Sequence, residues 1–341
     1  MVREYGENAK IVGLADVSGC AEDPDGLDHD ELLRLVRESK SISAFNPEKL
    51  GPEGVLHTCE TTEGTKMRNS MHNRVVADAF VPCGGRPNTI DMVNYRNFLQ
   101  ADGTPSSKLI VEGANIFITA EARKALHDEA GVMIIKDSSA NKGGVITSSY
   151  EICAAMLLSE DDFFKNKKQI VEEVLEKLRG LAKREAELLL REYETFGDTL
   201  PETSQIISNC INRTTDALGA ALDSLPFEDR EKLLPLFRAH LPKTLADLAF
   251  DDVHNRVPEA YIKNAIASCL ASKLVYKEGT KFIDSLPPKD LANIAIKYVQ
   301  KENEIAVLIE RLAGSEMPEE EKAQIIKLLE AGGARTALGA F

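Results

Sequence analysis

The sequence predicts an α/β protein in which an incomplete parallel sheet is followed by an all-helical C-terminal domain. Up to about residue 150, short apolar runs alternate with helical patterns, as they do in successive βα units. Beyond that point, apolar residues recur almost everywhere with the 3.6-residue period of an α-helix. Since 341 residues leave room for roughly two domains, we place these at residues 1–150 and 151–341.

The composition narrows the class of protein and its partners. Hydrophobic residues make up 43% and charged residues 28%, which is typical of a folded chain and excludes collagenous and disordered classes. Lysine and arginine number 41 against 55 aspartates and glutamates, so the formal charge is −14 and we expect no nucleic-acid partner. Apolar stretches such as Ile152–Leu158 fall short of the roughly 20 residues that span a bilayer, so we expect no membrane partner.

The cysteines and the first residues bear on the compartment. The six cysteines are scattered, with no C-x-x-C pair and no histidine at metal-ligand spacing. This pattern predicts reduced thiols in an intracellular protein, and no metal site. The first ten residues carry no secretory or transit pattern. We expect a cytoplasmic or mitochondrial protein whose targeting region is not among these residues.

Short apolar runs predict the strands of the sheet. They cover Ile11–Asp16 and residues 79–82, 108–111 and 132–135. After the first run, Asp28 precedes Glu31 by three residues, which predicts a capped amphipathic helix. Further helices of this half are predicted over residues 89–100 and 119–129.

The second half predicts a compact helical domain. It has no fixed-period repeat and no sustained heptad, which excludes a solenoid and a coiled coil. One long helix carries Ile170, Val174 and Leu178 on a single face. Prolines at helix-start and loop positions separate it from further helices near residues 203–224, 228–240, 258–276, 288–312 and 318–331.

Asp16 is the first candidate binding residue, because ligands of open parallel sheets lie at the carboxyl ends of the strands. Its carboxylate suits the two ribose hydroxyls of an adenosine and repels a 2′-phosphate, which favours NAD over NADP. The alternative is an aspartate that only turns the chain into Val17-Ser18-Gly19. The G-x-G-x-x-G loop that should precede such an acid by about 20 residues is absent. We therefore expect the first strand and the pyrophosphate loop of a Rossmann-type domain to be missing.

Glycines and asparagines mark the ends of the other strands. Gly84 and Gly85 would let the backbone approach a ligand closely, although a plain strand-to-helix turn explains them equally well. Asn115 and Asn141 each present an amide donor and acceptor, which suits a carboxamide such as that of nicotinamide. Ser148, one turn into the helix after Asn141, is placed to donate to a carboxylate.

Several segments together resemble the NAD-domain motifs of glutamate dehydrogenases. They are Leu14–Gly19, Asp23–Leu27, Val81–Pro87, Val111–Asn115 and Asn141–Val145. The Gly-Gly-Arg-Pro and Lys-Asp-Ser-Ser-Ala-Asn-Lys-Gly-Gly-Val segments are similar to the large NAD-specific type rather than to the short hexameric type. Residues 256–261 and 271–276 are similar to the C-terminal region of that type, so the resemblance spans most of the chain.

The resemblance implies roles for individual residues. It implies that Asp16 and Val17 contact the adenosine ribose, and that the backbone of Pro82, Cys83 and Gly84 passes beside the cofactor. Asn115 and Asn141 would border the nicotinamide and its ribose. Val145 and Ser148 would line the pocket for the substrate's side-chain carboxylate. The implied cofactor is NAD, and the implied reaction is oxidative deamination of L-glutamate to 2-oxoglutarate and ammonia.

The sequence departs from the family in one respect that bears on activity. In this family the catalytic lysine and aspartate belong to an N-terminal substrate domain, and nothing in these residues corresponds to it. We therefore assign no catalytic residue. We expect the C-terminal portion of an NAD-dependent glutamate dehydrogenase, inactive as an isolated chain and homo-oligomeric in the complete enzyme.

Two other hypotheses stay open. The chain is alternatively a non-catalytic regulatory or partner protein derived from the same fold, acting through its helical half. It is alternatively a related dehydrogenase acting on leucine or phenylalanine. Ser148 suits a substrate carboxylate, whereas an apolar residue at that position would suit an aliphatic substrate.

Overall fold

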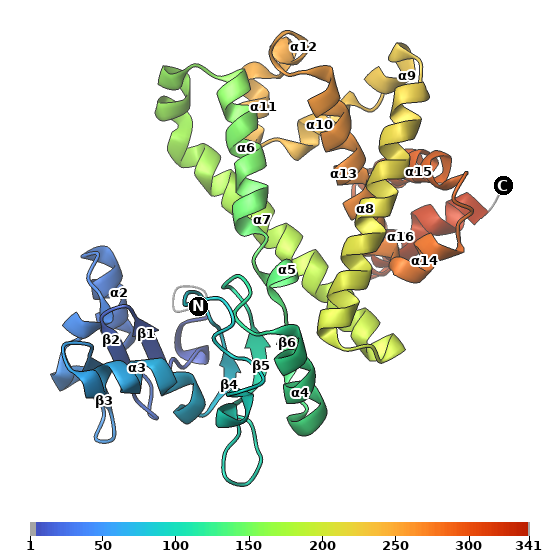
Figure 1. Ribbon diagram of the computed structural model, residues 1–341. Helices are drawn as coiled ribbons and strands as arrows, with labels where there is room; N and C mark the ends of the chain where they lie inside the picture. The colour runs from blue at the N-terminus through green and yellow to red at the C-terminus, as the bar shows by residue number, and fades with distance from the viewer. Residues whose placement is uncertain (1–4, 340–341) are drawn as a thin grey trace. The chain divides into compact units, whose positions relative to one another are not determined.

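The computed structural model describes residues 5–339 and divides into two compact units (Figure 1). The first unit comprises the described residues through Lys142 together with Thr199–Pro201, and the second comprises Gly143–Asp198 and the described residues from Glu202 onward. Residues 1–4 and 340–341, which the sequence assigned to the outer ends of the two domains, lie outside the described residues.

The first unit contains an antiparallel sheet that the sequence did not predict. Its strands are β1 (Gly13–Asp16), β2 (Gly19–Glu22) and β3 (Val55–Thr58), in that order. The prediction that Ile11–Asp16 belongs to the parallel sheet is therefore wrong. Asp16 pairs with Gly19 across a two-residue turn, so β1 continues directly into a hairpin instead of a crossover helix.

Two helices accompany this antiparallel sheet. Helix α2 (His29–Arg37) begins as the sequence predicts, because the Asp28 carboxylate accepts a 2.8 Å hydrogen bond from the Glu31 N–H. Helix α3 (Thr62–Arg74), for which the sequence predicted no helix, packs against β2 and β3. Short 3₁₀ turns complete this part of the chain at Gly6–Asn8, Ile42–Ala44 and Pro47–Lys49.

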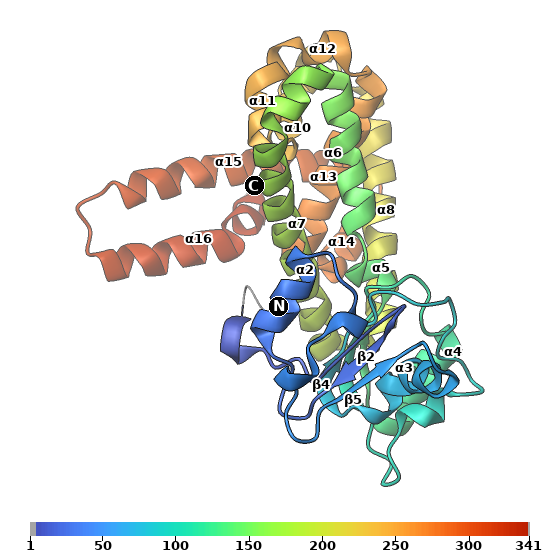
Figure 2. The same cartoon turned by 90° about the vertical axis from the view of Figure 1, so that its left-hand side faces the viewer.

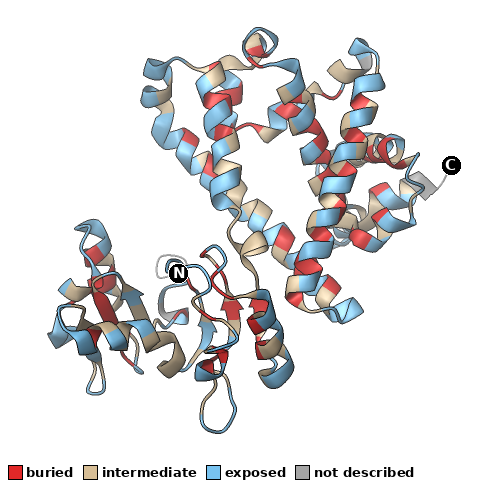
Figure 3. Ribbon diagram, in the orientation of Figure 1, coloured by how far each residue is buried: buried red, intermediate tan, exposed pale blue. Residues whose placement is uncertain are grey.

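A second sheet of three parallel strands confirms the predicted α/β class. It consists of β4 (Ala77–Phe80), β5 (Ser107–Val111) and β6 (Met133–Ile135), in that order. Helix α4 (Ala120–Ala130) follows β5; Thr119 caps its start, and Gly131 ends it with a φ of 64°. Buried apolar side chains from the sheet, α4 and the intervening loops form one core (Figure 3), which includes Ile90, Phe98, Ile110, Phe117, Ile118, Leu126 and Ile134.

The helix predicted over residues 89–100 is not present; only a 3₁₀ turn, Tyr95–Phe98, forms there. Ile90 instead pairs with Ile118 as a parallel bridge. The Asp91 carboxylate accepts hydrogen bonds from the Val93 and Asn94 N–H groups. These local bonds compete with helical ones, which explains the error.

Over its described residues the second unit contains only helices and the turns and loops that join them, as predicted. Its helices are α6 (Gly143–Leu157), α7 (Glu160–Phe196), α8 (Leu200–Ser224), α9 (Phe227–Glu231), α10 (Leu234–His240), α11 (Lys243–Ala249), α12 (Val253–Arg256), α13 (Glu259–Glu278), α14 (Thr280–Ser285), α15 (Leu291–Ala313) and α16 (Glu319–Gly339), with a 3₁₀ turn at Phe250–Asp252. The first two residues of α8, Leu200 and Pro201, belong to the first unit. The single helix predicted over residues 228–240 is two helices, and Pro235 lies in the first turn of the second. Helices α15 and α16 run side by side as a hairpin (Figure 2). No helix within residues 5–339 is both long and apolar enough to cross a bilayer.

Candidate functional site

The candidate site lies at the carboxyl edge of the parallel sheet, where three strands end in the predicted residues. Pro82, Cys83 and Gly84 follow β4, and Asn115 follows β5. Asn141 follows β6 and the short helix α5 (Asp137–Ala140). Because carboxyl ends of parallel strands meet at one edge, all five residues belong to the same part of the first unit.

The loops after β4 and β5 are in direct contact. A Cβ atom built on Gly113 would lie 3.3 Å from the Cys83 sulfur and 3.3 Å from the Pro82 carbonyl oxygen. The Asn88 N–H donates to the Ile116 carbonyl at 2.7 Å, and the Ile90 N–H donates to the Phe117 carbonyl at 3.1 Å. The first two site segments therefore form one surface.

The loops after β5 and β6 are joined by the two predicted asparagines. The Asn141 Nδ2–H donates to Asn115 Oδ1 over 2.7 Å. Asn115 is exposed and Asn141 is half-buried, so this amide pair meets solvent at the sheet edge. An amide pair linked by one bond keeps further N–H donors and an acceptor oxygen, the complement of a carboxamide.

A buried ion pair joins the start of the loop after β5 to α4, and the sequence did not indicate it. Glu112 is fully buried, and Arg123 from α4 is 10% exposed. The Arg123 Nε–Glu112 Oε2 distance is 2.7 Å and the Nη2–Oε1 distance is 3.1 Å. Burial raises the pKa of Glu112 above its usual value, although Arg123 opposes this shift. No local pattern indicates this pair, because the two residues belong to different elements.

Asp16 and Val17 lie at the hairpin of the antiparallel sheet, not at the parallel sheet edge. Asp16 Oδ1 accepts from the Ser18 N–H and hydroxyl at 2.7 and 2.6 Å, and Oδ2 accepts from the Ile42 N–H at 2.8 Å. Partial burial alone would raise the pKa of Asp16, but these hydrogen bonds lower it. The geometry matches the alternative interpretation, in which this aspartate turns the chain; a ribose contact stays a prediction.

Val145 and Ser148 lie near the start of α6 in the second unit. Val145 is 78% exposed, and Ser148 is exposed as well. Thr147, between them, directs its hydroxyl back to the Gly143 and Gly144 carbonyl oxygens at 2.9 and 3.0 Å. Their proposed role at the substrate carboxylate stays a prediction.

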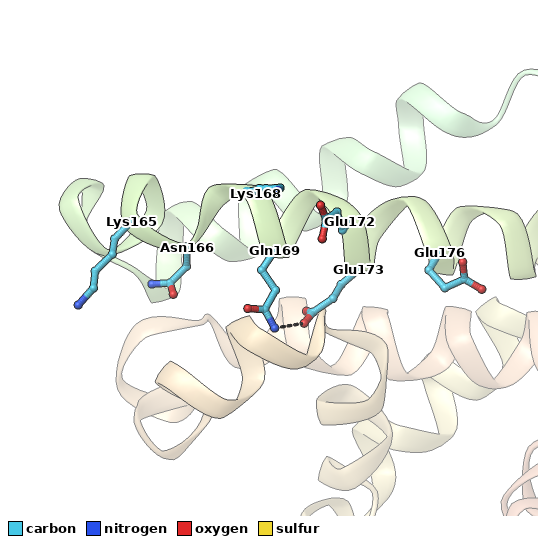
Figure 4. Close-up of a pocket in the computed structure, with 7 residues that line it drawn as sticks. All are labelled: Lys165, Asn166, Lys168, Gln169, Glu172, Glu173 and Glu176. Carbon is cyan, nitrogen blue, oxygen red and sulfur yellow. Dashed lines mark hydrogen bonds between the residues drawn. The ribbon is translucent and has the colours of Figure 1, made fainter. Parts of the chain in front are cut away.

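A hollow of about 600 Å³ in the second unit does not resemble this site. Its lining side chains all come from one helix (Figure 4), and their residue numbers place them on α7. The Gln169 side-chain amide donates to the Glu173 carboxylate, and this hydrogen bond is 3.3 Å long. The other lining residues are Lys165, Asn166, Lys168, Glu172 and Glu176. Within residues 5–339, no three histidine, cysteine, aspartate or glutamate side chains are grouped to hold a metal ion.

Alanine substitutions of the two glycines after β4 are expected to differ in their effect on stability. Gly85 has a φ of 122°, and a Cβ there would lie 2.9 Å from the Phe117 ring, whereas a Cβ on Gly84 meets nothing within 4 Å. We expect Gly85→Ala to lower the unfolding free energy of the first unit by about 2 kcal/mol. Gly84→Ala should change it by less than about 0.5 kcal/mol. Urea unfolding of the two variants measures both values, and equal losses would contradict this geometry.

Comparisons with known proteins identify the family of this chain. The family model described as Glutamate/Leucine/Phenylalanine/Valine dehydrogenase matches residues 3–196. A probable NAD-specific glutamate dehydrogenase of Schizosaccharomyces pombe is 36% identical over 297 residues, which cover 79% of this chain and 26% of that protein.

Two further relatives show the same proportions. Glutamate dehydrogenase 2 of Dictyostelium discoideum is 34% identical over 295 residues, covering 79% of this chain and 28% of the relative. The NAD-specific glutamate dehydrogenase of Saccharomyces cerevisiae is 34% identical over 302 residues, which cover 80% of this chain and 28% of the relative. The chain thus spans about a quarter of the length of these relatives. With more than half of its residues matched by the family model, the chain belongs to the glutamate/leucine/phenylalanine/valine dehydrogenase family.

Proposed function

We propose that this chain forms the nicotinamide-facing part of an NAD-dependent dehydrogenase that deaminates L-glutamate to 2-oxoglutarate and ammonia. The observation that carries the proposal is the 2.7 Å hydrogen bond between Asn141 and Asn115 at the edge of the parallel sheet. The names of the relatives, NAD-specific glutamate dehydrogenases, supply the cofactor and substrate that we propose for this chain.

The residues at the sheet edge fit the nicotinamide end of NAD. The amides of Asn115 and Asn141 offer the donor and acceptor that a carboxamide needs. The open space beside Gly84 leaves the backbone after Pro82 and Cys83 accessible to a ligand. Bound NAD would accept a hydride from the amino-acid Cα. The protein residues would orient the ring and shield one of its faces.

We extend the proposal to the remaining predicted residues with the roles that the resemblance implies. Asp16 and Val17 would contact the adenosine ribose. The Asp16 carboxylate would then accept hydrogen bonds from the ribose as well as from the N–H groups of Ser18 and Ile42. Val145 and Ser148 would receive the substrate side-chain carboxylate, where an exposed hydroxyl can donate.

We further propose that the chain acts as the C-terminal portion of a longer enzyme, which assembles as a homo-oligomer. Its 341 residues span about a quarter of the relatives' length, and we assign no general acid or base among them. Catalysis then requires groups that other residues supply. The purified chain should bind NADH weakly and should not turn over glutamate.

A binding and activity experiment tests these statements together. NADH fluorescence is titrated with the 341-residue chain and with Asn141→Ala, and Asn69→Ala serves as a control on the exposed surface of α3. We expect Asn141→Ala to weaken NADH binding about tenfold, because one end of the amide pair is lost. Asn69→Ala should bind as the parent does.

Two results would count against the proposal. Equal NADH affinity in Asn141→Ala and the parent chain would remove the nicotinamide assignment. Sustained glutamate-dependent reduction of NAD by the purified chain alone would show that the catalytic acid and base are among these residues.

A further inference from the structure

We propose that Arg123 is a positioning residue that holds Asn115 and Asn141 in place for the nicotinamide. Arg123 contacts neither asparagine through a hydrogen bond that the structure shows. It acts through two carboxylates, Glu112 and Asp137, which follow neighbouring strands. The functional half of this inference rests on the proposed NAD site.

The first link runs from Arg123 through Glu112 to the loop after β5. The guanidinium binds both oxygens of the buried Glu112 carboxylate, at 2.7 and 3.1 Å. Glu112 Oε1 also accepts a hydrogen bond from the Ile118 N–H at 3.0 Å. The Glu112 carboxylate therefore connects the two ends of the loop that contains Asn115. Arg123, on α4, fixes the position of this carboxylate.

The second link runs through Asp137 to both asparagines. Arg123 Nη2 lies 3.7 Å from Asp137 Oδ1, and Asp137 Oδ2 accepts from the Ile116 N–H, next to Asn115, at 2.8 Å. The Asp137 carbonyl oxygen accepts from the Asn141 N–H at 2.8 Å. A single residue thus connects the backbones beside both amides.

The backbone of Ile116 indicates that this loop is held rather than relaxed. Ile116 has a φ of 52° although it is β-branched and 54% exposed. A left-handed conformation is unfavourable for a β-branched residue, so surrounding contacts must impose it. The Asp137 carboxylate binds its N–H, and the Asn88 N–H binds its carbonyl oxygen at 2.7 Å. Without Arg123, the Asp137 contact loses its neighbouring positive charge.

The geometry also explains why arginine occupies this position. A planar guanidinium binds one carboxylate with two parallel N–H groups and keeps a further N–H edge for a second carboxylate. A lysine ammonium supplies a point charge with no such fork. We therefore expect Arg123→Lys to restore charge balance without restoring the position of the asparagines.

The experiment measures position without the cofactor. The 341-residue chain is labelled with ¹⁵N-asparagine, and the Asn141 side-chain amide signal is assigned by its loss in Asn141→Asp. In Arg123→Met and Arg123→Lys, we expect this signal to move toward that of a free amide and its hydrogen exchange to accelerate. Arg96→Met is the matched control, because Arg96 also binds a carboxylate, Glu129, but is 73% exposed. It should leave the signal unchanged.

A double variant separates positioning from stability. Arg123→Met alone leaves the Glu112 charge buried without its arginine partner, which should destabilise the folded chain. Glu112→Gln/Arg123→Met removes that charge, so the variant should recover thermal stability. We still expect a displaced Asn141 amide signal and about tenfold weaker NADH binding, because the fork that aligns the two loops is absent.

The outcomes distinguish this inference from the proposed function. A folded double variant with an unchanged Asn141 signal would overturn the positioning role. A displaced signal with unchanged NADH affinity would overturn its functional part. If the parent chain binds no NADH while the signals change as expected, Arg123 positions the amides and the proposed NAD site is wrong.

Discussion

Replacing Gly64 by alanine is expected to lower the unfolding free energy of the first unit by about 3 kcal/mol or more. Gly64 is buried in the first turn of α3, and Thr61 accepts its N–H at 3.0 Å. A Cβ at this position would lie 1.9 Å from the carbonyl oxygen of Thr58, the last residue of β3. Because the obstacle is backbone, no side-chain rotation relieves it, and α3 has to move away from the sheet.

Thermal unfolding measures this effect. For a unit of this size the loss corresponds to a decrease in Tm of roughly 10 °C. Gly84→Ala is the matched control, since its new Cβ meets nothing within 4 Å and should leave Tm nearly unchanged. An equally stable Gly64→Ala variant would mean that α3 does not approach β3 as closely as the structure has it.

The second large effect is expected in the helical unit, where Glu192→Ala should cost about 3 kcal/mol. Glu192 lies on α7 and is 5% exposed. Its Oε1 accepts from the Thr280 N–H at 2.6 Å, and both of its oxygens lie 2.9 Å from the Thr280 hydroxyl. Thr280 opens α14, and its own N-cap, Gly279, offers no side chain. The glutamate therefore caps a helix 88 residues away.

Chemical denaturation of Glu192→Ala, Glu192→Gln and Glu187→Ala tests this cap. Glu187 lies on the same helix but is 62% exposed, and its ion pair with Lys183 is long, at 3.9 Å. Glu187→Ala should therefore lower the unfolding free energy by less than about 1 kcal/mol. Glu192→Gln keeps an acceptor oxygen without the charge. Its loss of unfolding free energy should fall between those of Glu192→Ala and Glu187→Ala. Similar losses for Glu187→Ala and Glu192→Ala would exclude the capping role.

Segments with strong local signals were predicted correctly. The strand runs over residues 108–111 and 132–135 correspond to β5 and β6, and the helix predicted over residues 119–129 corresponds to α4. Apolar runs, a threonine cap and a terminal glycine act over a few residues, so they can be read from neighbouring positions. The 3.6-residue period of the second half is local in the same sense.

The candidate site was predicted in part. The sequence indicated Cys83, Asn115 and Asn141, because strand ends followed by glycine or asparagine are visible along the chain. It did not indicate Arg123, because its partner Glu112 lies eleven residues earlier in the chain, outside α4, and the two side chains meet only in the folded protein.

What the sequence determined by itself is the α/β class, the helical second half, the resemblance to glutamate dehydrogenases and the edge residues of the parallel sheet. Only the tertiary structure decided that Ile11–Asp16 enters an antiparallel hairpin, that Arg123 joins two strand ends and that Glu192 caps α14. The physical reason is range. Propensity, period and caps depend on adjacent residues, whereas strand partners and buried charge pairs depend on segments that meet only when the chain has folded.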